Sequence, residues 1–498
     1  MNTHLTLFFV AFGGFVIRFL RLGAIENDHY VYLARAHQML HGAWPVRDFV
    51  DPGFPFGYVL SFLAAAVAGP TLLTEAVFSV TLFAVALAAT YWLTRRAAAS
   101  HAVALLSIAL LLLFPPRLYN SSKMLVPVVA MVIAWAYCDR PTRLRVVMLG
   151  TWTGIAFLFR HDYGIFVGAV TMAMLVVQHW ANWRLLAERI LTCAGVAAIV
   201  VAPWLMYVQA QQGLPEYLAS ALRFSAAERN RTVTQWAPVY YVMTAVPVVA
   251  LLMAVHGARF VSRAQITFAA LLVLVSDLVL LRDAPGSRLP DVYGITTVVA
   301  AIVIGALLPP RRQPAWSGRK KLILTSGLAV GAAAWALAAQ ASSNFAGPVQ
   351  RWSQVSTRLR NASPEIMPDP QRAPLVDYIS RCTRDSDRIL VGGFAPELPV
   401  LTHRAFAAGM PDWIRGYYED PGDVARARAQ LTIERVSIAV MLDGGDAFTA
   451  SWPAVAADLR ARGLQPYHLQ LTDERVELWI APSERLDRAT GLPCEGTE

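Results

Sequence analysis

The sequence is poor in charge and in cysteine. Only 15% of its 498 residues are charged, whereas 56% are hydrophobic, and four are cysteine. Because an ordinary soluble domain is about 25% charged, this composition excludes a disordered protein and argues against a soluble multidomain enzyme. No two cysteines have the Cys-x-x-Cys spacing, so a zinc ribbon or a thioredoxin-like motif has no support.

Other features that the sequence lacks exclude further classes of protein. The Gly392–Gly393 pair is not part of a Gly-x-Gly-x-x-Gly motif that opens a helix, so no dinucleotide site is predicted. The apolar runs do not divide into two similar halves with matched Gly/Pro breaks, as they do in many transporters. The net charge of +9 lies mostly in short stretches between apolar runs, and this placement indicates membrane topology rather than a nucleic-acid partner.

What the chain has in abundance is apolar runs long enough to cross a membrane. We predict a polytopic α-helical membrane protein with about eleven spans, at about 4–20, 74–94, 101–115, 124–138, 146–159, 163–180, 190–208, 239–255, 264–281, 292–308 and 322–341. Residues 54–69 are also apolar, but as a helix they reach only about 24 Å, short of a bilayer core of about 30 Å.

The charges of the loops set the topology. If 54–69 lies in the membrane interface, one set of loops holds 14 Lys and Arg in 43 residues, and the opposite set holds 12 in 87. The dense set is expected in the cytoplasm. We therefore predict that 54–69 does not span, that the N-terminus is cytoplasmic and that the C-terminus is outside.

The hydrophobic pattern divides the chain into a membrane module, 1–344, and a smaller domain, 345–498. In the second part, strands are predicted at 388–394, 436–442, 466–471 and 476–481, with helices between them. This pattern indicates an extracytoplasmic α/β domain. Cys382 and Cys494 flank it, and in an oxidising compartment they could form a disulfide.

The strongest candidate site is the first loop, residues 21–73, which carries the acids Glu26, Asp28, Asp48 and Asp51. Residues 29–41 are predicted to form an amphipathic helix that suits the bilayer interface. One face carries Tyr32, Leu33, Ala36, Met39 and Leu40, and another carries Arg35, His37, Gln38 and His41. Carboxylates at a membrane surface can take a proton from an acceptor hydroxyl or amine. With His29, Asp28 and Asp51 could instead hold a divalent metal.

Cations lie at the ends of several spans on the predicted outer side. The candidates for binding the substrate are Lys123, Arg160, Asp162 and Arg288, together with Arg47 and Asp48 of the first loop. Arg and Lys at helix ends can clamp a phosphate, and they can equally anchor a helix at the interface. These cations and the acids of the first loop are predicted to lie on the same side of the membrane. Acids suit an acceptor that loses a proton, and cations suit a donor that carries phosphate.

The stretch "ENDHYVYLARAHQMLHGAWPVRDFVDPGFPFGY" resembles the first external loop of GT-C glycosyltransferases. It is most similar to bacterial transferases of the protein-O-mannosyltransferase-like and Rgt-like type. Asp28 matches the acid of the family's first motif. Positions of the second motif are matched by Gly42, Pro45, Arg47, Asp48, Phe49, Asp51 and Pro55.

The resemblance implies an inverting transfer of a hexosyl or pentosyl group from a polyprenyl-phosphate sugar. The transfer would occur on the outer face of the bacterial cytoplasmic membrane, to a glycan, lipid or protein acceptor. It implies that Asp28 is the catalytic base or positions the acceptor, with Glu26 assisting and Asp51 orienting the acceptor or joining a metal. Because Pro52 and Gly53 follow Asp51, where some relatives have a basic residue, phosphate binding would fall to Lys123, Arg160 or Arg288.

Two other classes remain open from the sequence. A lipid-linked-sugar flippase or transporter would move the substrate without making a bond, and it predicts charges at mid-membrane. A non-catalytic envelope-glycan assembly protein, whose external domain binds cell-wall glycan, would keep its function when the spans are exchanged. An enzyme would lose activity when the first loop alone is changed. The sequence does not specify the sugar, the acceptor or a requirement for a divalent metal.

Overall fold

The structure, a computed structural model, describes residues 3–229, 238–256, 261–280, 288–307, 347–471 and 475–495. The chain divides into two compact units. The first contains Met1–Arg21, Ala76–Met206 and Arg229–Val355. The second contains Leu22–Glu75, Tyr207–Glu228 and Ser356–Glu498, so it combines the first loop with the C-terminal region.

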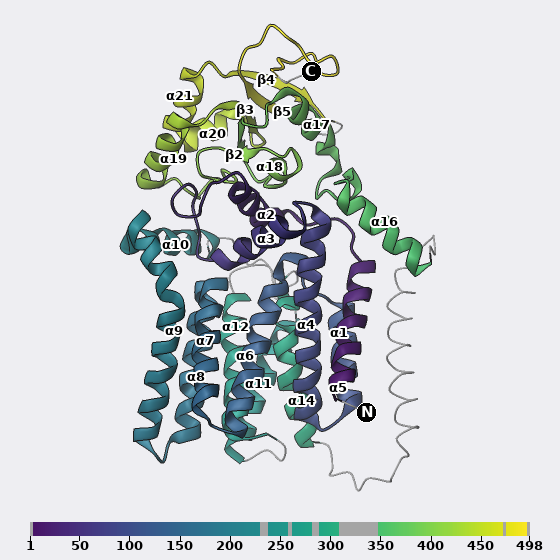
Figure 1. The fold of residues 1–498 in the computed structure, drawn as a ribbon, viewed down its shortest axis with the longest axis vertical. Helices are drawn as coiled ribbons and strands as arrows, with labels where there is room; N and C mark the ends of the chain where they lie inside the picture. Colours follow the sequence, from purple (N-terminus) through teal and green to yellow (C-terminus); the bar gives the residue numbers. More distant parts are fainter. Residues whose placement is uncertain are drawn as a thin grey trace. The chain divides into compact units, whose positions relative to one another are not determined.

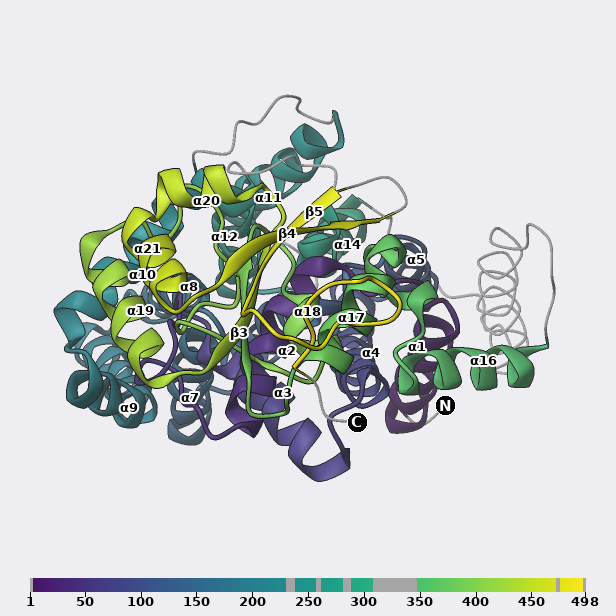
Figure 2. The same ribbon diagram turned by 90° about the horizontal axis from the view of Figure 1, so that it is seen from above.

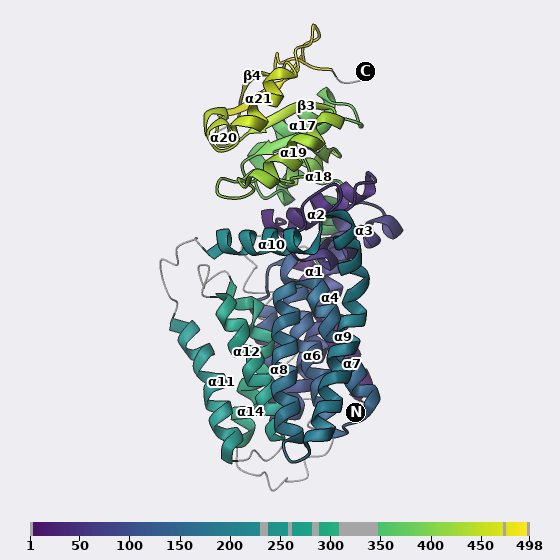
Figure 3. The same cartoon turned by 90° about the vertical axis from the view of Figure 1, so that its left-hand side faces the viewer.

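The first unit is a bundle of apolar helices (Figure 1). Its principal helices are α1 (Thr3–Leu20), α4 (Leu72–Ala98), α5 (His101–Leu113), α6 (Ser121–Asp139), α7 (Arg143–Phe159), α8 (His161–His179), α9 (Trp183–Gln211), α11 (Pro238–His256), α12 (Arg263–Leu280) and α14 (Tyr293–Leu307). Helix α16 (Pro348–Arg360) is largely polar, and its residues are divided between the first unit and the second. Two short 3-10 turns, η1 (Leu118–Asn120) and η2 (Leu289–Asp291), precede α6 and α14. Figure 3 shows α11, α12 and α14 together, with α12 packed against α8.

Ten of the eleven predicted spans coincide with helices, and the eleventh, 322–341, lies outside the described residues. Among the residues that the structure describes, five helices are long and apolar enough, by length and composition alone, to cross a membrane. They are Thr3–Leu20, Leu72–Ala98, Leu118–Asp139, His161–His179 and Trp183–Gln211. Segments such as His101–Leu113 and Tyr293–Leu307 are apolar but shorter. The total of eleven spans therefore stays a prediction, whereas the helical membrane-protein architecture is confirmed.

Small residues allow α7 and α9 to approach closely. A Cβ on Gly150 would lie 2.5 Å from the carbonyl oxygen of Cys193, and one on Gly154 would lie 2.8 Å from the Val200 side chain. The two glycines are four residues apart on one face of α7, the spacing that favours close helix packing in membranes.

The second unit contains a five-stranded mixed sheet in the order β2-β1-β3-β5-β4. Its strands are β1 (Arg388–Gly392), β2 (Ala405–Phe406), β3 (Val436–Met441), β4 (Gln465–Gln470) and β5 (Arg475–Ile480). β1 is parallel to β2 and β3, whereas β5 is antiparallel to β3 and β4. The four predicted strands are confirmed. The two-residue β2 was not predicted, because a strand this short leaves no alternation in the sequence.

Helices cover both faces of the sheet (Figure 2). One face packs against α19 (Pro421–Ile433), α20 (Gly445–Ser451) and α21 (Pro453–Ala461). The other packs against α17 (Ala373–Cys382) and α18 (Glu397–Leu401). Successive residues of β1 alternate between the two cores, since Leu390 joins the first and Ile389 and Val391 join the second. A strand that is buried on both faces has a nearly continuous run of apolar residues in its sequence, and "RILVGGF" has such a run. The predicted C-terminal α/β region is therefore present.

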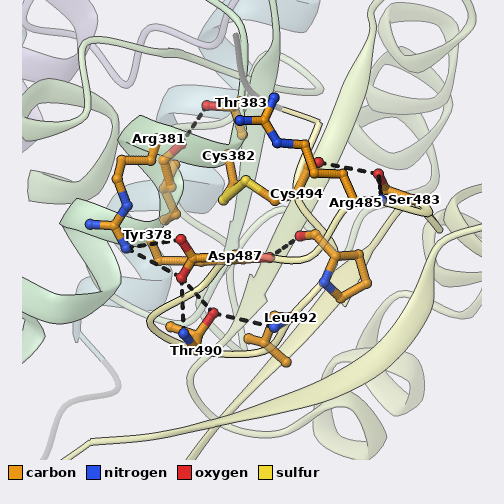
Figure 4. The surroundings of a disulfide bond; sticks show 12 residues. Tyr378, Arg381, Cys382, Thr383, Ser483, Arg485, Asp487, Thr490, Leu492 and Cys494 are labelled. Atoms are coloured by element: carbon orange, nitrogen blue, oxygen red, sulfur yellow. Dashed lines mark hydrogen bonds and ion pairs between the residues drawn. A yellow bond between two sulfur atoms is a disulfide. The ribbon is translucent and has the colours of Figure 1, made fainter. Parts of the chain in front are cut away.

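A disulfide between Cys382 and Cys494 ties the last residues of the described chain to α17. Around it, the Tyr378 hydroxyl donates to the carbonyl of Pro493 at 2.5 Å, and Arg381 pairs with Asp487 (Figure 4). Asp487 also accepts from the Thr490 hydroxyl at 2.9 Å. The sequence left this pairing open, and the structure contains it.

The first loop folds into α2 (Asn27–Leu40) and α3 (Pro55–Ala68), which pack against each other. The helix expected over 29–41 is confirmed, but the surroundings of its polar face were not predicted. Arg35 and Gln38 are each 1% exposed. The Gln38 amide donates to the Phe406 carbonyl at 3.1 Å and accepts from the Phe406 N–H at 3.0 Å. This face of α2 therefore meets the edge strand β2 of the C-terminal sheet rather than water.

Candidate functional site

Glu26 and Asp28 lie at the N-terminus of α2. Glu26 is the N-cap residue, with an extended backbone (φ −70°, ψ 149°), and its carbonyl accepts from the His29 N–H at 2.9 Å. Asp28 lies in the first turn and is half-buried. The amino end of a helix favours negative charge, and the fold places both acids at this end of α2. The preceding Ile25 N–H donates to the Ile366 carbonyl at 2.9 Å, which anchors the start of the helix.

His29 points into the protein. Its Nε2 lies 3.0 Å from Oε1 of Glu75, and the two side chains are only 1% and 6% exposed. Glu75 lies in the first turn of α4, so this pair fixes the helix that carries Asp28. Sequence reasoning missed Glu75, whose only signal was an acid at the start of an apolar run.

Arg47 and Asp48 form an exposed pair. Nη2 of Arg47 lies 2.6 Å from Oδ2 of Asp48, and the same oxygen accepts from the Trp44 N–H at 2.6 Å. The hydrogen bond to Asp48 raises the pKa of Arg47. The pair closes a turn in which Val46 has a φ of 68°. It leaves the Arg47 side chain 49% exposed, within reach of a ligand from solvent.

Asp51 is buried and its carboxylate is fully engaged. One oxygen accepts from the N–H groups of Gly53 and Phe54, both at 3.2 Å. The other accepts from the Tyr217 hydroxyl of α10 (Leu214–Arg229) at 2.7 Å. Asp51 is 3% exposed, and these bonds set the turn that leads into α3.

The geometry does not suit a metal at the expected acids. Among the described residues, three donor atoms of His, Cys, Asp or Glu lie within 4.8 Å of one another only at Cys382, Asp487 and Cys494. The two cysteines there are joined in a disulfide. Asp28, Asp51 and His29 do not form such a group, and no step is derived through a metal at these residues.

The first unit contains a second group of predicted residues. Lys123, at the start of α6, is 6% exposed, and its Nζ lies 3.2 Å from Oδ2 of Asp291 in η2. The Asn120 amide donates to both oxygens of Asp291, at 2.8 and 3.0 Å. Arg160 and Arg288 are near enough to act electrostatically on Lys123. We name Lys123, Arg160 and Arg288 the cation cluster.

Arg160 links two helices of this cluster. It is both the C-cap residue of α7 and the N-cap residue of α8. Its guanidinium binds the Asp162 carboxylate in a bidentate manner, at 3.0 and 2.7 Å. The carboxylates of Asp162 and Asp291 thus pair with Arg160 and Lys123.

The structure therefore brings the predicted residues together in two groups. The acids of the first loop, with Arg47, lie in the second unit, and the cation cluster with Asp162 lies in the first. Asn120 and Asp291 complete the surroundings of Lys123. Asn120 was not predicted, because its partner Asp291 is 171 positions away in the sequence.

Two solved structures share the fold over nearly the whole chain. They are crystal structures of ArnT from Cupriavidus metallidurans, one bound to undecaprenyl phosphate and one in the apo state. The TM-scores are 0.59 and 0.55, at 14% sequence identity, and each alignment covers 96% of this chain and 98% of the other. The chain has the fold of ArnT.

ArnT is a glycosyltransferase of the GT-C superfamily. The fold expected from the first-loop resemblance is therefore confirmed, and at this identity the ArnT comparison concerns the fold alone. No family model matches the sequence. No curated protein matches it either.

Proposed function

We propose that the protein is a membrane glycosyltransferase that moves a sugar from a polyprenyl-phosphate donor to an extracytoplasmic acceptor. The observation that carries the proposal is the ArnT fold over 96% of the chain, because one of the ArnT structures described above is bound to undecaprenyl phosphate. The cation cluster supports it, because a partly buried group of cations at helix ends suits the phosphate of such a lipid.

The proposed reaction is a single inverting displacement. The acceptor O–H or N–H attacks the anomeric carbon, and the Asp28 carboxylate takes the acceptor proton. The bond between that carbon and the phosphate oxygen breaks, and polyprenyl phosphate leaves with the electron pair. Glu26, the residue before the first turn of the same helix, assists by keeping the local potential negative.

The cation cluster has the complementary role in the proposal. As the sugar–phosphate bond breaks, negative charge grows on the leaving phosphate, and Lys123, Arg160 and Arg288 offset it. Preorganised charges of this kind are among the largest contributions to enzymatic rates. Asp162 and Asp291 hold two of the cations in place through the bonds described above, whereas Asp51 positions the first loop.

The proposed location is the bacterial cytoplasmic membrane, with the N-terminus inside and the C-terminal region outside. The Cys382–Cys494 disulfide supports this orientation, because disulfides persist in oxidising compartments. The acceptor, a glycan, lipid or protein, would then meet the enzyme outside the cytoplasm.

The test uses native membranes, which supply the acceptor. Membranes that contain the wild type or Asp28→Asn receive a panel of labelled polyprenyl-phosphate sugars, and donor loss and labelled product are followed. We expect wild type to consume one donor and Asp28→Asn to lose at least about a thousandfold in rate, as expected when an essential proton acceptor is removed. Normal turnover by the variant would refute the assignment of Asp28.

A matched control separates chemistry from folding. Asp446 is an exposed acid in the first turn of α20, so Asp446→Asn removes a carboxylate from an equivalent position in a helix outside the proposed site. Its activity is expected to equal that of wild type. If folded wild type consumes no donor, the flippase hypothesis is favoured over the transferase. The next experiment is then to measure lipid translocation in vesicles.

A further inference from the structure

Three histidines gather where α2 meets the C-terminal sheet. His37 and His41 lie one turn apart near the end of α2, and His403 lies between α18 and β2. The ring centroid of His37 is 4.5 Å from that of His41 and 6.1 Å from that of His403. Two imidazoles that share one tetrahedral Zn²⁺ have centroids about 5 Å apart, given Zn–N distances of about 2.0–2.1 Å. The observed spacings lie on either side of that value.

The central ring has an unused nitrogen. His37 is 8% exposed, and its Nδ1 is buried without a hydrogen-bond partner. Leaving a buried polar atom unpaired costs about 1–3 kcal/mol. A metal ion bound by this ring would remove that cost.

The backbone orients the second ring. Nδ1 of His41 lies 3.0 Å from the carbonyl oxygen of His37. When this nitrogen donates its proton to that carbonyl, Nε2 keeps its lone pair for a ligand. A histidine held by a backbone carbonyl in this way is the usual arrangement at protein metal sites.

The third ring comes from a strained turn. His403 has a φ of 56° and is exposed, a conformation that persists only where the surroundings enforce it. The next residue, Arg404, provides that constraint. Its guanidinium donates to the hydroxyl and the carbonyl of Thr383, both at 2.9 Å, and to the Ser380 carbonyl at 3.2 Å.

Two of the imidazoles have a lowered pKa, which favours the neutral form that coordinates a metal. Burial, then the neighbouring His41, His403 and Arg404, lower the pKa of His37 to about 3. Burial and Arg404 also lower the pKa of His403. The Arg404 charge opposes a bound cation, and Asp385, 2.9 Å from that guanidinium, partly offsets it.

We propose that His37, His41 and His403 form a binding site for one divalent transition-metal ion of the Zn²⁺ or Cu²⁺ class, the class for which imidazole is a preferred ligand. The three ring nitrogens do not all lie within 4.8 Å of one another, so the exposed His41 and His403 rings turn towards the buried His37 on binding. The ion would join α2 to the turn between α18 and β2. This proposal does not depend on the proposed transferase activity.

The test uses the whole chain in detergent, purified without a polyhistidine tag, stripped with a chelator and kept oxidised. Zn²⁺ is titrated against a chromophoric chelator, and Cu²⁺ is followed by electron paramagnetic resonance for nitrogen coupling. We expect one equivalent to bind. His41→Asn and His403→Asn should each weaken binding at least about tenfold, and saturating Zn²⁺ should raise the Tm of wild type.

His468→Asn is the matched control, because His468 is an exposed histidine of β4 outside the cluster. It should leave the affinity unchanged. The absence of a stoichiometric site would overturn the proposal, as would an affinity that neither His41→Asn nor His403→Asn lowers. His37 is left intact in these variants, because its burial makes a substitution there a test of folding as well as of binding.

Discussion

At the scale of single residues, the central contact is the buried pair of Lys123 and Asp291. Its partners are 168 positions apart, so sequence reasoning could nominate Lys123 from its place beside an apolar run but could not find what holds it. A buried ion pair is strongly destabilised when one partner is removed, by about 3–5 kcal/mol. This property allows two substitutions to separate phosphate binding from stability.

Lys123→Gln and Asp291→Asn are expected to have different effects on the KM for donor. Both should lower the Tm, because each leaves a buried charge without its partner. Only Lys123→Gln removes a charge that we propose binds the donor phosphate, so its KM for donor should rise about tenfold or more, the value of one charged hydrogen bond. Asp291→Asn frees the Lys123 ammonium and should leave that KM unchanged or lower.

The comparison is made at a temperature at which both variants are folded. Equal losses of donor affinity in the two variants would show that the pair acts through structure alone.

Acids such as Asp28 were predicted because they belong to a short local motif. The Glu75 partner of His29 was not, because the pairing is made only by the fold.

At the scale of elements, the sequence predicts periodicity better than it predicts surroundings. The pattern of residues 29–41 correctly indicates a helix, but it cannot distinguish a polar face in water from one whose polar groups find partners in protein. Gln38 belongs to the second case, since its amide satisfies both backbone groups of Phe406. β1 and β3 were predictable because burial on both faces leaves a continuous apolar run.

The contact between the first loop and the C-terminal region can be tested at Gly409. This residue has a φ of 67°, and a Cβ there would lie 2.8 Å from the carbonyl oxygen of Asp48. Gly409→Ala therefore combines backbone strain with a clash against fixed backbone. We expect a loss of about 2–3 kcal/mol in stability, measured as a lower Tm in detergent, with reduced transfer because the Asp48 turn is displaced.

Gly491→Ala provides the matched comparison. Its φ of 70° imposes similar strain, but a Cβ there meets nothing within 4 Å. The expected loss is about 1 kcal/mol, with transfer unchanged. If both variants lose the same stability and activity, close packing at Gly409 does not position the first loop.

At the scale of the whole molecule, the cysteines report on orientation. The Cys382–Cys494 bond closes 112 residues, and loops of about 100 residues gain about 4–5 kcal/mol from such a bond in the chain-entropy view. The pairing could be considered from sequence because only four cysteines exist, and two of them lie within or beside apolar runs. Proximity, however, comes only from the fold.

Thiol mapping in intact cells tests this orientation. After denaturation without reductant, Cys138 and Cys193 should react with a maleimide, and Cys382 and Cys494 should react only after reduction. In a host that cannot form periplasmic disulfides, all four should react, and the Tm should fall. Four free thiols in a normal host would contradict an extracytoplasmic C-terminal region.

The central claim is that the protein breaks the bond between a sugar and a polyprenyl phosphate. The most direct measurement is mass spectrometry of the lipids in native membranes, following the donor selected by the panel and the polyprenyl phosphate it releases. We predict that wild type converts donor to free polyprenyl phosphate as labelled product forms, whereas Asp28→Asn leaves the donor intact. Translocation of intact donor by wild type, with no polyprenyl phosphate released, would contradict the account.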